Sequence, residues 1–178
     1  MDRRQKKTRE AIFAAFSELI RARRYESITV QDIIDKADIG RSTFYSHFET
    51  KDTLLKAMCG DIFEHIIEGE VCDYQPGQSA TLEAKLTHIL RHFETKKSDV
   101  RAILSSQSHD VFLGYLRDYL GTLFEMHLAD FHTEVPDSFL LHHLIGTFCE
   151  AVGWWIRENP DLSPDKVASY YMSVVETH

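Results

Sequence analysis

The sequence predicts an all-α protein of about nine helices, and three observations support this fold class. Apolar residues recur at helical spacing along most of the 178-residue chain, and no segment shows the alternation of a half-buried strand. The 4 prolines and 8 glycines are too few for a β-sandwich, which needs a turn about every 8–12 residues. The apolar content of 43% and the charged content of 27% are those of a folded globular protein rather than a disordered one.

Four helices separated by tight breaks are predicted in the first part of the chain, where apolar residues share one helical face. Thr29 followed by Asp32 has the pattern of an N-cap with an acidic residue in the first turn. Residues 38–40 and 48–50 break the helical pattern, and Thr50 is expected to cap the fourth helix. The predicted ranges are Lys7–Arg24, Val30–Ala37, Arg41–His47 and Lys51 to about Gly69.

Five further helices are predicted between polar loops and prolines in the remaining chain. Loops or breaks are expected at residues 73–79, 105–108, 133–136 and 159–164. Ser98 is expected to cap a short helix, and Ser163 the last one, which has Pro164 at its first position. The predicted ranges are about Ala80–Thr95, Asp99–Leu104, Asp110–Phe131, Asp137 or Ser138 to Arg157, and a final helix from Pro164.

Charge is divided unevenly along the chain. The net charge of −8 combines +3 in residues 1–56 with −11 in residues 57–178. A polyanionic partner would therefore meet the N-terminal part, although a merely solvated helix explains this basic charge as well. The same two interpretations, contact with a nucleic acid or simple solvation, apply to a basic terminal segment. This segment contains Arg3, Arg4, Lys6 and Lys7.

A helix-turn-helix motif is the feature most informative about function. Two short helices, Val30–Ala37 and Arg41–His47, are joined by a three-residue turn that contains Gly40. Phe44 and Phe48 share the inward face of the second helix, and its outward residues are small or polar with no carboxylate. In this motif the second helix enters the major groove of DNA by its N-terminal residues. The pattern therefore predicts a DNA-binding helix, with the alternative that the two helices simply pack together.

The motif and its flanks resemble the tetracycline repressor (TetR) family of bacterial regulators. The resemblance is carried by Ile28–Leu55, ITVQDIIDKADIGRSTFYSHFETKDTLL. The positions that match the family pattern are Thr29, Ala37, Ile39, Thr43-Phe44-Tyr45, Phe48 and Lys51. Three positions depart from this pattern. Asp38 stands where the family usually has Gly, Gly40 where it has Ser, and Ser42 where it has Gly or Ala. We interpret these departures as a change in DNA sequence preference.

The resemblance implies a helix-turn-helix DNA-binding domain at residues 1–50 and a helical ligand-binding and dimerisation domain at residues 51–178. Thr43 and Tyr45 are expected to hydrogen-bond DNA phosphates, and Lys51 to hold a phosphate at the N-terminus of its helix. Arg41 and Ser42 are the candidates for contacts with base edges, with guanine as the expected partner of Arg41. The candidate DNA-binding residues are Thr29, Arg41, Ser42, Thr43, Tyr45, His47 and Lys51.

The two C-terminal helices carry more apolar surface than one buried face requires. The first has apolar residues over about half of its circumference, and the last helix has a similar surplus. We therefore expect a homodimer through these helices, as the resemblance also implies, with a larger monomeric core as the alternative. A two-fold dimer would read a palindromic operator. The candidate interface residues are Leu141, Leu144, Phe148, Val152, Trp155, Tyr170, Tyr171 and Val174.

Polar residues on otherwise apolar helices are candidates for a small-molecule site, because members of the family commonly bind an effector between the fourth and eighth helices. These candidates are His65, His88, His92, Tyr115, Tyr119 and His143. Each is also explained as an ordinary solvated or hydrogen-bonded side chain. His88 and His92 have metal-ligand spacing, but no cysteine or carboxylate completes a ligand set, so we expect no metal and no other cofactor.

The predicted function is a dimeric DNA-binding regulator, most simply a repressor that a small-molecule effector releases from its operator. The alternative is a co-activator or binding protein that contacts another protein rather than DNA. The motifs of serine hydrolases, zinc proteases, P-loop NTPases and dinucleotide-binding enzymes are missing from the sequence, which argues against an enzyme.

A cytoplasmic location is expected. The cysteines, Cys59, Cys72 and Cys149, form no CxxC pair and are typical of a reducing compartment. No apolar stretch follows the charged N-terminus, so a signal peptide is not expected. The most apolar run, Phe139–Ile156, contains Glu150 and two histidines, so no membrane span is expected.

Overall fold

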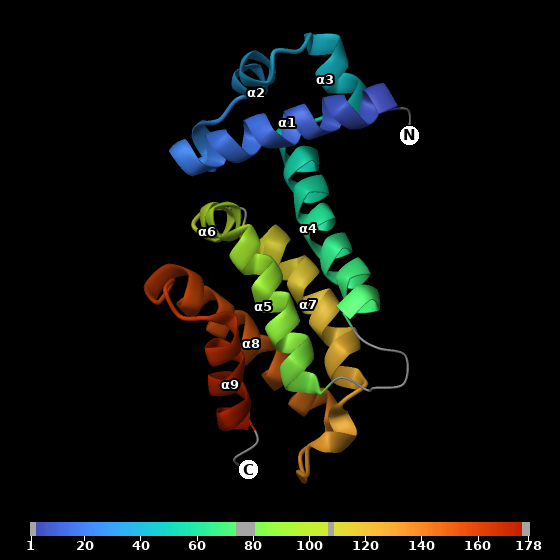
Figure 1. The fold of residues 1–178 in the computed structure, drawn as a ribbon, viewed down its shortest axis with the longest axis vertical. Coiled ribbons are helices and arrows are strands. Elements are labelled where there is room, and N and C mark those ends of the chain that lie inside the picture. The colour runs from blue at the N-terminus through green and yellow to red at the C-terminus, as the bar shows by residue number, and fades with distance from the viewer. Residues whose placement is uncertain (1–2, 74–80, 107–108, 176–178) are drawn as a thin grey trace. The chain divides into compact units, whose positions relative to one another are not determined.

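Helices make up all the regular secondary structure in the part of the chain that the computed structural model describes. This part is residues 3–73, 81–106 and 109–175, of which residues 64–73 are described by their backbone alone (Figure 1). The α-helices are α1 (Arg3–Ala22), α2 (Val30–Ala37), α3 (Arg41–His47), α4 (Lys51–Asp73), α5 (Leu82–Thr95), α6 (Lys97–Leu104), α7 (His109–Glu125), α8 (Asp137–Glu158) and α9 (Pro164–Val175). Two short 3-10 helices are η1 (Tyr25–Ser27) and η2 (Leu128–Asp130). The all-α fold class is confirmed.

The chain divides into two compact units. Unit 1 consists of Met1–Asp61 and Ser98–Phe112, and unit 2 of Ile62–Lys97 and Leu113–His178. The helix-turn-helix pair, α2 and α3, belongs to unit 1, whereas α5, α8 and α9 belong to unit 2. Unit 1 also takes in the start of α4 and most of α6. The predicted domain boundary at residue 50 divides the chain by expected function. The packing of the two units does not test such a division, so this boundary stays a prediction.

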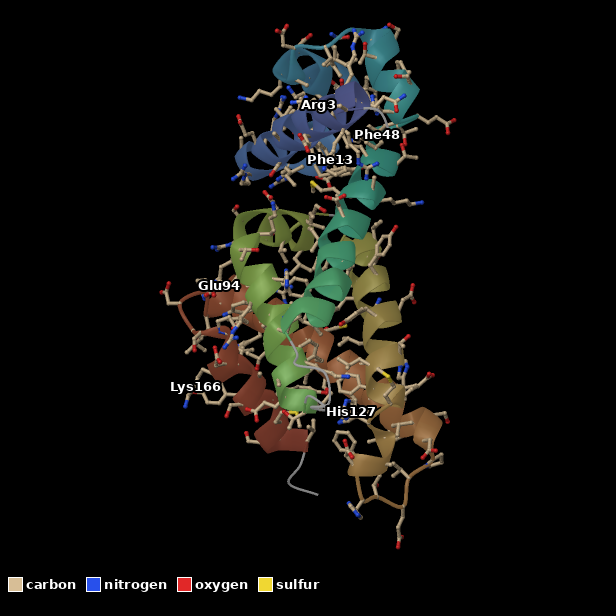
Figure 2. The ribbon with its side chains drawn as sticks, turned by 45° about the vertical axis from the view of Figure 1, so that its right-hand side comes forward. Arg3, Phe13, Phe48, Glu94, His127 and Lys166 are labelled. Atoms are coloured by element: carbon tan, nitrogen blue, oxygen red, sulfur yellow. The ribbon has the colours of Figure 1, made fainter. Side chains whose placement is uncertain are left out.

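Unit 1 is built on α1, which packs against α2. The inward face of α1 is buried, and Phe16 has no exposed surface. Phe13 stacks on Phe48 with ring centroids 5.9 Å apart, and Figure 2 shows the two residues side by side. On another side of α1, the Ser17 hydroxyl donates to Asp99 Oδ1 of α6 at 2.5 Å. These contacts make α1 the platform on which both α2 and α6 rest.

The turn between α2 and α3 explains why residues 38–40 break the helical pattern. Asp38 has φ 51° and ψ 52°, which is the left-handed conformation. It is the only residue other than glycine with a positive φ in the described part of the chain. Glycine is favoured there because it has no Cβ, and aspartate tolerates the conformation better than most residues. This geometry accounts for the glycine that the family usually has at position 38.

Unit 2 has its core where α9 packs against both α5 and α8. Phe148 and Trp155 of α8 are 0% exposed. The Trp155 indole donates to the Leu162 carbonyl at 2.8 Å, and the Tyr171 hydroxyl donates to the Leu144 carbonyl at 2.8 Å. Each buried ring therefore also satisfies its polar atom. One face of α8 is therefore buried against the rest of unit 2.

The predicted extension of the seventh helix to Phe131 is wrong, because α7 ends at Glu125. Beyond this point the backbone forms bonds between residues three apart. The His127 amide donates to the Phe124 carbonyl at 2.9 Å, and the Phe131 amide to the Leu128 carbonyl at 3.1 Å. This tighter bonding produces η2 instead of a further α-helical turn.

Other helix limits differ by a few residues. The cap predicted at Ser98 is wrong, because α6 begins at Lys97 and Ser98 lies in its first turn. Helix α1 begins at Arg3, so the basic terminal residues from this position on are helical. The loop predicted at residues 73–79 lies, beyond Asp73, outside the described residues. Among the described helices, none combines the length and the apolar character needed to cross a membrane.

Candidate nucleic-acid interface and the groove on α8 and α9

The outer face of α3 carries most of the polar side chains predicted to contact DNA. Phe44 is 0% exposed and anchors the helix, whereas its neighbour Tyr45 is 51% exposed. The two rings meet edge to face with centroids 5.6 Å apart, so the core anchor also orients the exposed ring. The other predicted residues of α3 are exposed or half-buried: Arg41, Ser42, Thr43 and His47. Burial of one face therefore leaves the opposite face available to a polyanion.

A hydrogen-bonded chain on the outside of α2 positions Arg41. Arg41 Nη2 donates to Gln31 Oε1 at 2.8 Å, and Gln31 Nε2 donates to Asp35 Oδ1 at 2.7 Å. A guanidinium that is already held in place loses less side-chain entropy when it binds a base edge or a phosphate. Sequence reasoning missed Gln31. The spacing of Gln31 and Asp35 on one helix was visible, but the contact with Arg41 depends on how α2 and α3 cross.

Lys51 faces backbone carbonyls at the first residue of α4. Its ammonium donates to the carbonyls of Tyr25 and Ile28 at 3.0 and 2.9 Å, and lies 3.4 Å from the carbonyl of Glu26. It also sits 4.4 Å from the centre of the Tyr25 ring. An ammonium has three donors, and all three have acceptors here. Lys51 therefore fixes η1 and the start of α2, and its contact with phosphate stays a prediction.

Thr29 is engaged in the capping box that begins α2. Its hydroxyl accepts from the Asp32 amide at 3.1 Å, and its amide donates to Asp32 Oδ2 at 2.7 Å. Arg23 adds an ion pair to the same carboxylate at 2.9 Å. The hydrogen bonds from Thr29, followed by the contact with Arg23, lower the pKa of Asp32 to about 2. The predicted N-cap is confirmed.

The residues predicted to bind an effector lie in more than one place in unit 2. His88 is buried on α5 and meets His92 with ring centroids 4.5 Å apart. Tyr115 and Tyr119 of α7 lie 6.0 and 6.4 Å from the Phe63 ring. The side chain of the sixth candidate, His65, lies outside the described residues. His143 belongs to a different surface, a groove on α8 and α9.

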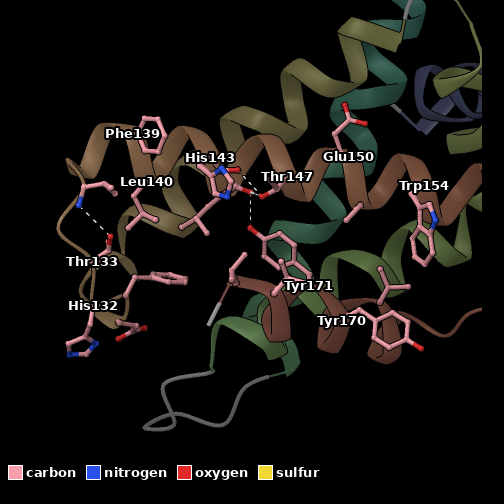
Figure 3. Close-up of a pocket in the computed structure, with 18 of the residues that line it drawn as sticks. His132, Thr133, Phe139, Leu140, His143, Thr147, Glu150, Trp154, Tyr170 and Tyr171 are labelled. Carbon is pink, nitrogen blue, oxygen red and sulfur yellow. Dashed lines mark hydrogen bonds between the residues drawn. The ribbon is translucent and has the colours of Figure 1, made fainter. Parts of the chain in front are cut away.

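This groove has a volume of about 1070 Å³ and is lined mainly by the loop before α8 and by α8 and α9 (Figure 3). Large apolar side chains on it remain accessible to solvent: Phe139 is 63% exposed, Tyr170 45% and Val174 70%. The Phe139 ring stacks on His143 with centroids 6.5 Å apart. Trp154 also lines the groove, although it lies outside the apolar face of α8 from which the interface residues were predicted.

The eight residues predicted for the dimer interface differ in accessibility. Three remain accessible, and these are Leu141, Tyr170 and Val174. The other five, Leu144, Phe148, Val152, Trp155 and Tyr171, are buried within the single chain. Periodicity in sequence identifies apolar positions but does not separate those that face the chain's own core from those that face a partner.

Two family models match the chain. The description "Bacterial regulatory proteins, tetR family" applies to residues 12–58, and "Transcriptional regulator C-terminal region" to residues 80–177. A solved TetR transcriptional regulator from Streptococcus agalactiae is 35% identical, with a TM-score of 0.76. That alignment covers 98% of this chain and 97% of the other.

Two further relatives share less. The activator DhaS of the dhaKLM operon from Lactococcus lactis is 33% identical over 75 residues, which cover 42% of this chain and 40% of DhaS. The chain spans less than half the length of the curated relatives that it matches. The solved structure of AibR with isovaleryl coenzyme A and operator DNA is 20% identical with a TM-score of 0.60, over 95% of this chain and 98% of AibR, and shows likeness of fold alone.

Proposed function

The chain belongs to the TetR family of transcriptional regulators and carries its DNA-binding helix-turn-helix, and from this premise we propose that it binds a palindromic operator as a homodimer. The observation that carries the proposal is the surface of α3, where Phe44 is buried while Tyr45 and Arg41 are exposed. The family consists of regulators rather than enzymes. Because a bacterial operator lies in the cytoplasm, we place the action of the protein there.

The proposed DNA contacts follow from the position and the hydrogen-bond partners of each side chain. Arg41, supported by Gln31, reads a base edge, since a guanidinium matches the acceptors of guanine. Tyr45 and Thr43 contact phosphates, which fix the register of the helix without reading sequence. Lys51 contributes by holding the start of α2 in place, and its helix offers backbone amides at its N-terminus.

A second copy of the chain is the proposed occupant of the groove on α8 and α9. Phe139, Tyr170 and Val174 make an exposed apolar surface of the kind that marks an interface in a soluble protein. The accessible members of the predicted interface are proposed to make direct contacts. The buried members, such as Phe148, hold α8 and α9 together beneath them.

The proposed regulation combines operator binding with a small-molecule effector. We propose a repressor that a small-molecule effector releases. AibR, a protein of similar fold, was solved with both isovaleryl coenzyme A and operator DNA, and this supports the proposal of both kinds of partner. A co-activator that holds another protein is the second candidate. It is favoured by Asp38, an exposed carboxylate beside α3 that repels phosphates.

The test is fluorescence anisotropy with duplex DNA from upstream of the protein's own gene. Arg41→Ala is expected to cost about 1–3 kcal/mol of binding free energy, and wild-type affinity is expected to fall steeply with added salt. Tyr45→Ala is expected to weaken binding to all sequences alike. Arg91→Ala, which removes an exposed arginine of unit 2, is the matched control. Wild-type affinity in both α3 variants would contradict the proposal, and salt-independent binding of a protein partner would favour the co-activator.

A further inference from the structure

A second cleft lies wholly within unit 1, between the C-terminal end of α1, η1 and α6. Its volume is about 670 Å³. Four of the residues that line it are arginines, namely Arg21, Arg23, Arg24 and Arg101, whereas Glu26 is the one acidic residue in the lining. Three serines, Ser98, Ser105 and Ser106, add hydroxyl groups. The cleft therefore concentrates arginines in a chain whose net charge is −8.

The four arginines fall into two pairs with different surroundings. Arg21 Nε lies 3.3 Å from Asp99 Oδ1, and Arg23 Nη2 lies 2.9 Å from Asp32 Oδ1, so these two charges are balanced within the protein. Arg24 and Arg101 have no carboxylate within ion-pair distance among the residues that the structure describes. Two uncompensated guanidinium groups thus line one concave surface.

Uncompensated guanidinium groups in a cleft favour an anion with several oxygens. The planar fork of arginine donates two parallel hydrogen bonds to phosphate or carboxylate, and hydrogen bonds between ionised partners are about twice as strong as neutral ones. Ser105 is exposed at the rim, and Ser98 Oγ lies 3.5 Å from Arg21 Nη1. The Ser106 hydroxyl already donates to the Ile103 carbonyl at 2.8 Å. The available donors are therefore the two guanidinium groups and the hydroxyls of Ser98 and Ser105.

We propose that this cleft is a binding site for a phosphate group, held by Arg24 from one side and Arg101 from the other. Arg24 immediately precedes η1, and Arg101 lies on α6. An anion bound to both would link η1 to α6 in addition to the contact that Ser17 makes with Asp99. The site uses none of the side chains proposed to touch operator DNA on α3. Its ligand is a phosphorylated small molecule, and the DNA backbone is the other source of the same chemical group.

The test measures binding of pyrophosphate to the full chain by isothermal titration and by the shift in Tm, at constant ionic strength. A ligand that binds only the folded state raises Tm with increasing concentration. Arg24→Gln and Arg101→Gln are each expected to weaken pyrophosphate binding roughly tenfold or more, because each variant loses hydrogen bonds between ionised partners. Arg117→Gln, which removes an exposed arginine of unit 2, is the matched control and is expected to bind as the wild type does.

Operator binding by the same variants distinguishes the two sources of phosphate. Loss of pyrophosphate binding with unchanged DNA affinity assigns the site to a free phosphorylated ligand. Loss of DNA affinity in Arg24→Gln and Arg101→Gln, with no pyrophosphate binding by the wild type, assigns the phosphate to DNA. The proposal is overturned when both variants match the wild type for pyrophosphate and for DNA. The pyrophosphate measurement needs no operator, so its outcome is independent of the proposed regulatory function.

Discussion

The surface of α3 and the groove on α8 and α9 differ in the kind of side chain that they expose to solvent. On α3 the large apolar side chain, Phe44, is 0% exposed, and polar groups cover the outside. On α8 and α9 the chain buries Phe148 and Trp155 and still leaves Phe139 63% exposed and Val174 70% exposed. The first surface is complete without a partner and suits a hydrated polyanion. The second exposes contiguous apolar surface, which water solvates poorly, and this supports the proposed contact with a second copy.

The largest effect is expected when the buried anchor of α3 is removed. Phe44→Ala leaves a cavity beneath α3 and is expected to lower the free energy of unfolding by about 3–5 kcal/mol. Urea unfolding followed by circular dichroism measures the change. Phe44→Leu, which retains most of the buried volume, is the control and is expected to lose much less. Equal stability of Phe44→Ala and the wild type would show that the anchor is not needed.

The second prediction concerns the exposed apolar side chains of the groove on α8 and α9. Phe139→Ser combined with Val174→Ser removes exposed apolar surface from the groove and is expected to weaken self-association by at least about 2 kcal/mol, roughly thirtyfold in the dissociation constant. Sedimentation equilibrium measures this change. Met126→Ser is the matched control, because Met126 is 64% exposed but does not line the groove. A double variant that dimerises as tightly as the control would remove the groove from the interface.

The third prediction sharpens the account of α3. Gln31→Ala leaves Arg41 without its acceptor and is expected to cost about 0.5–1.5 kcal/mol of operator affinity. In the Arg41→Ala background the same change is expected to cost nearly nothing, because both residues act through one contact. A double-mutant cycle by fluorescence anisotropy measures the coupling. Additive losses would mean that Gln31 acts independently of Arg41.

The smallest effect concerns the turn that precedes α3. Asp38→Gly relieves the left-handed conformation at φ 51° and is expected to raise the free energy of unfolding by about 0.5–1 kcal/mol. It also removes a carboxylate beside the recognition helix, so operator affinity is expected to rise slightly. Asp38→Ala keeps the unfavourable φ and is expected to give no gain in stability. A shift in the urea midpoint of the alanine variant equal to that of Asp38→Gly would refute the role of φ.

Local chemistry made the helix-turn-helix predictable to the residue. The limits of α2 and α3 follow from Thr29, from the break at residues 38–40 and from the inward pair of phenylalanines, all of which act between near neighbours in the chain. The end of α7 was not predictable in this way. The apolar pattern continues through Leu128 and Phe131, and only the backbone bonding shows that the α-helix stops at Glu125.

The parts of the site that sequence reasoning missed depend on contacts between elements distant in the chain. Lys51 fits a phosphate-binding pattern by its position, yet its ammonium is directed at carbonyls 23 to 26 residues earlier. Gln31 and Arg41 are 10 residues apart and meet only because α2 and α3 cross. The burial of five of the eight predicted interface residues had the same origin, since helical periodicity shows that a face is apolar but not what covers it.

The bonds made by Lys51 have a mechanical consequence. They couple the first residue of α4 to the Tyr25 and Ile28 carbonyls, immediately ahead of the residue that caps α2. Any tilt of α4 at its origin must then either stretch these bonds or carry the front of the helix-turn-helix along with it. A shift of the first turn of α4 would therefore be passed directly to η1 and to the residue that caps α2.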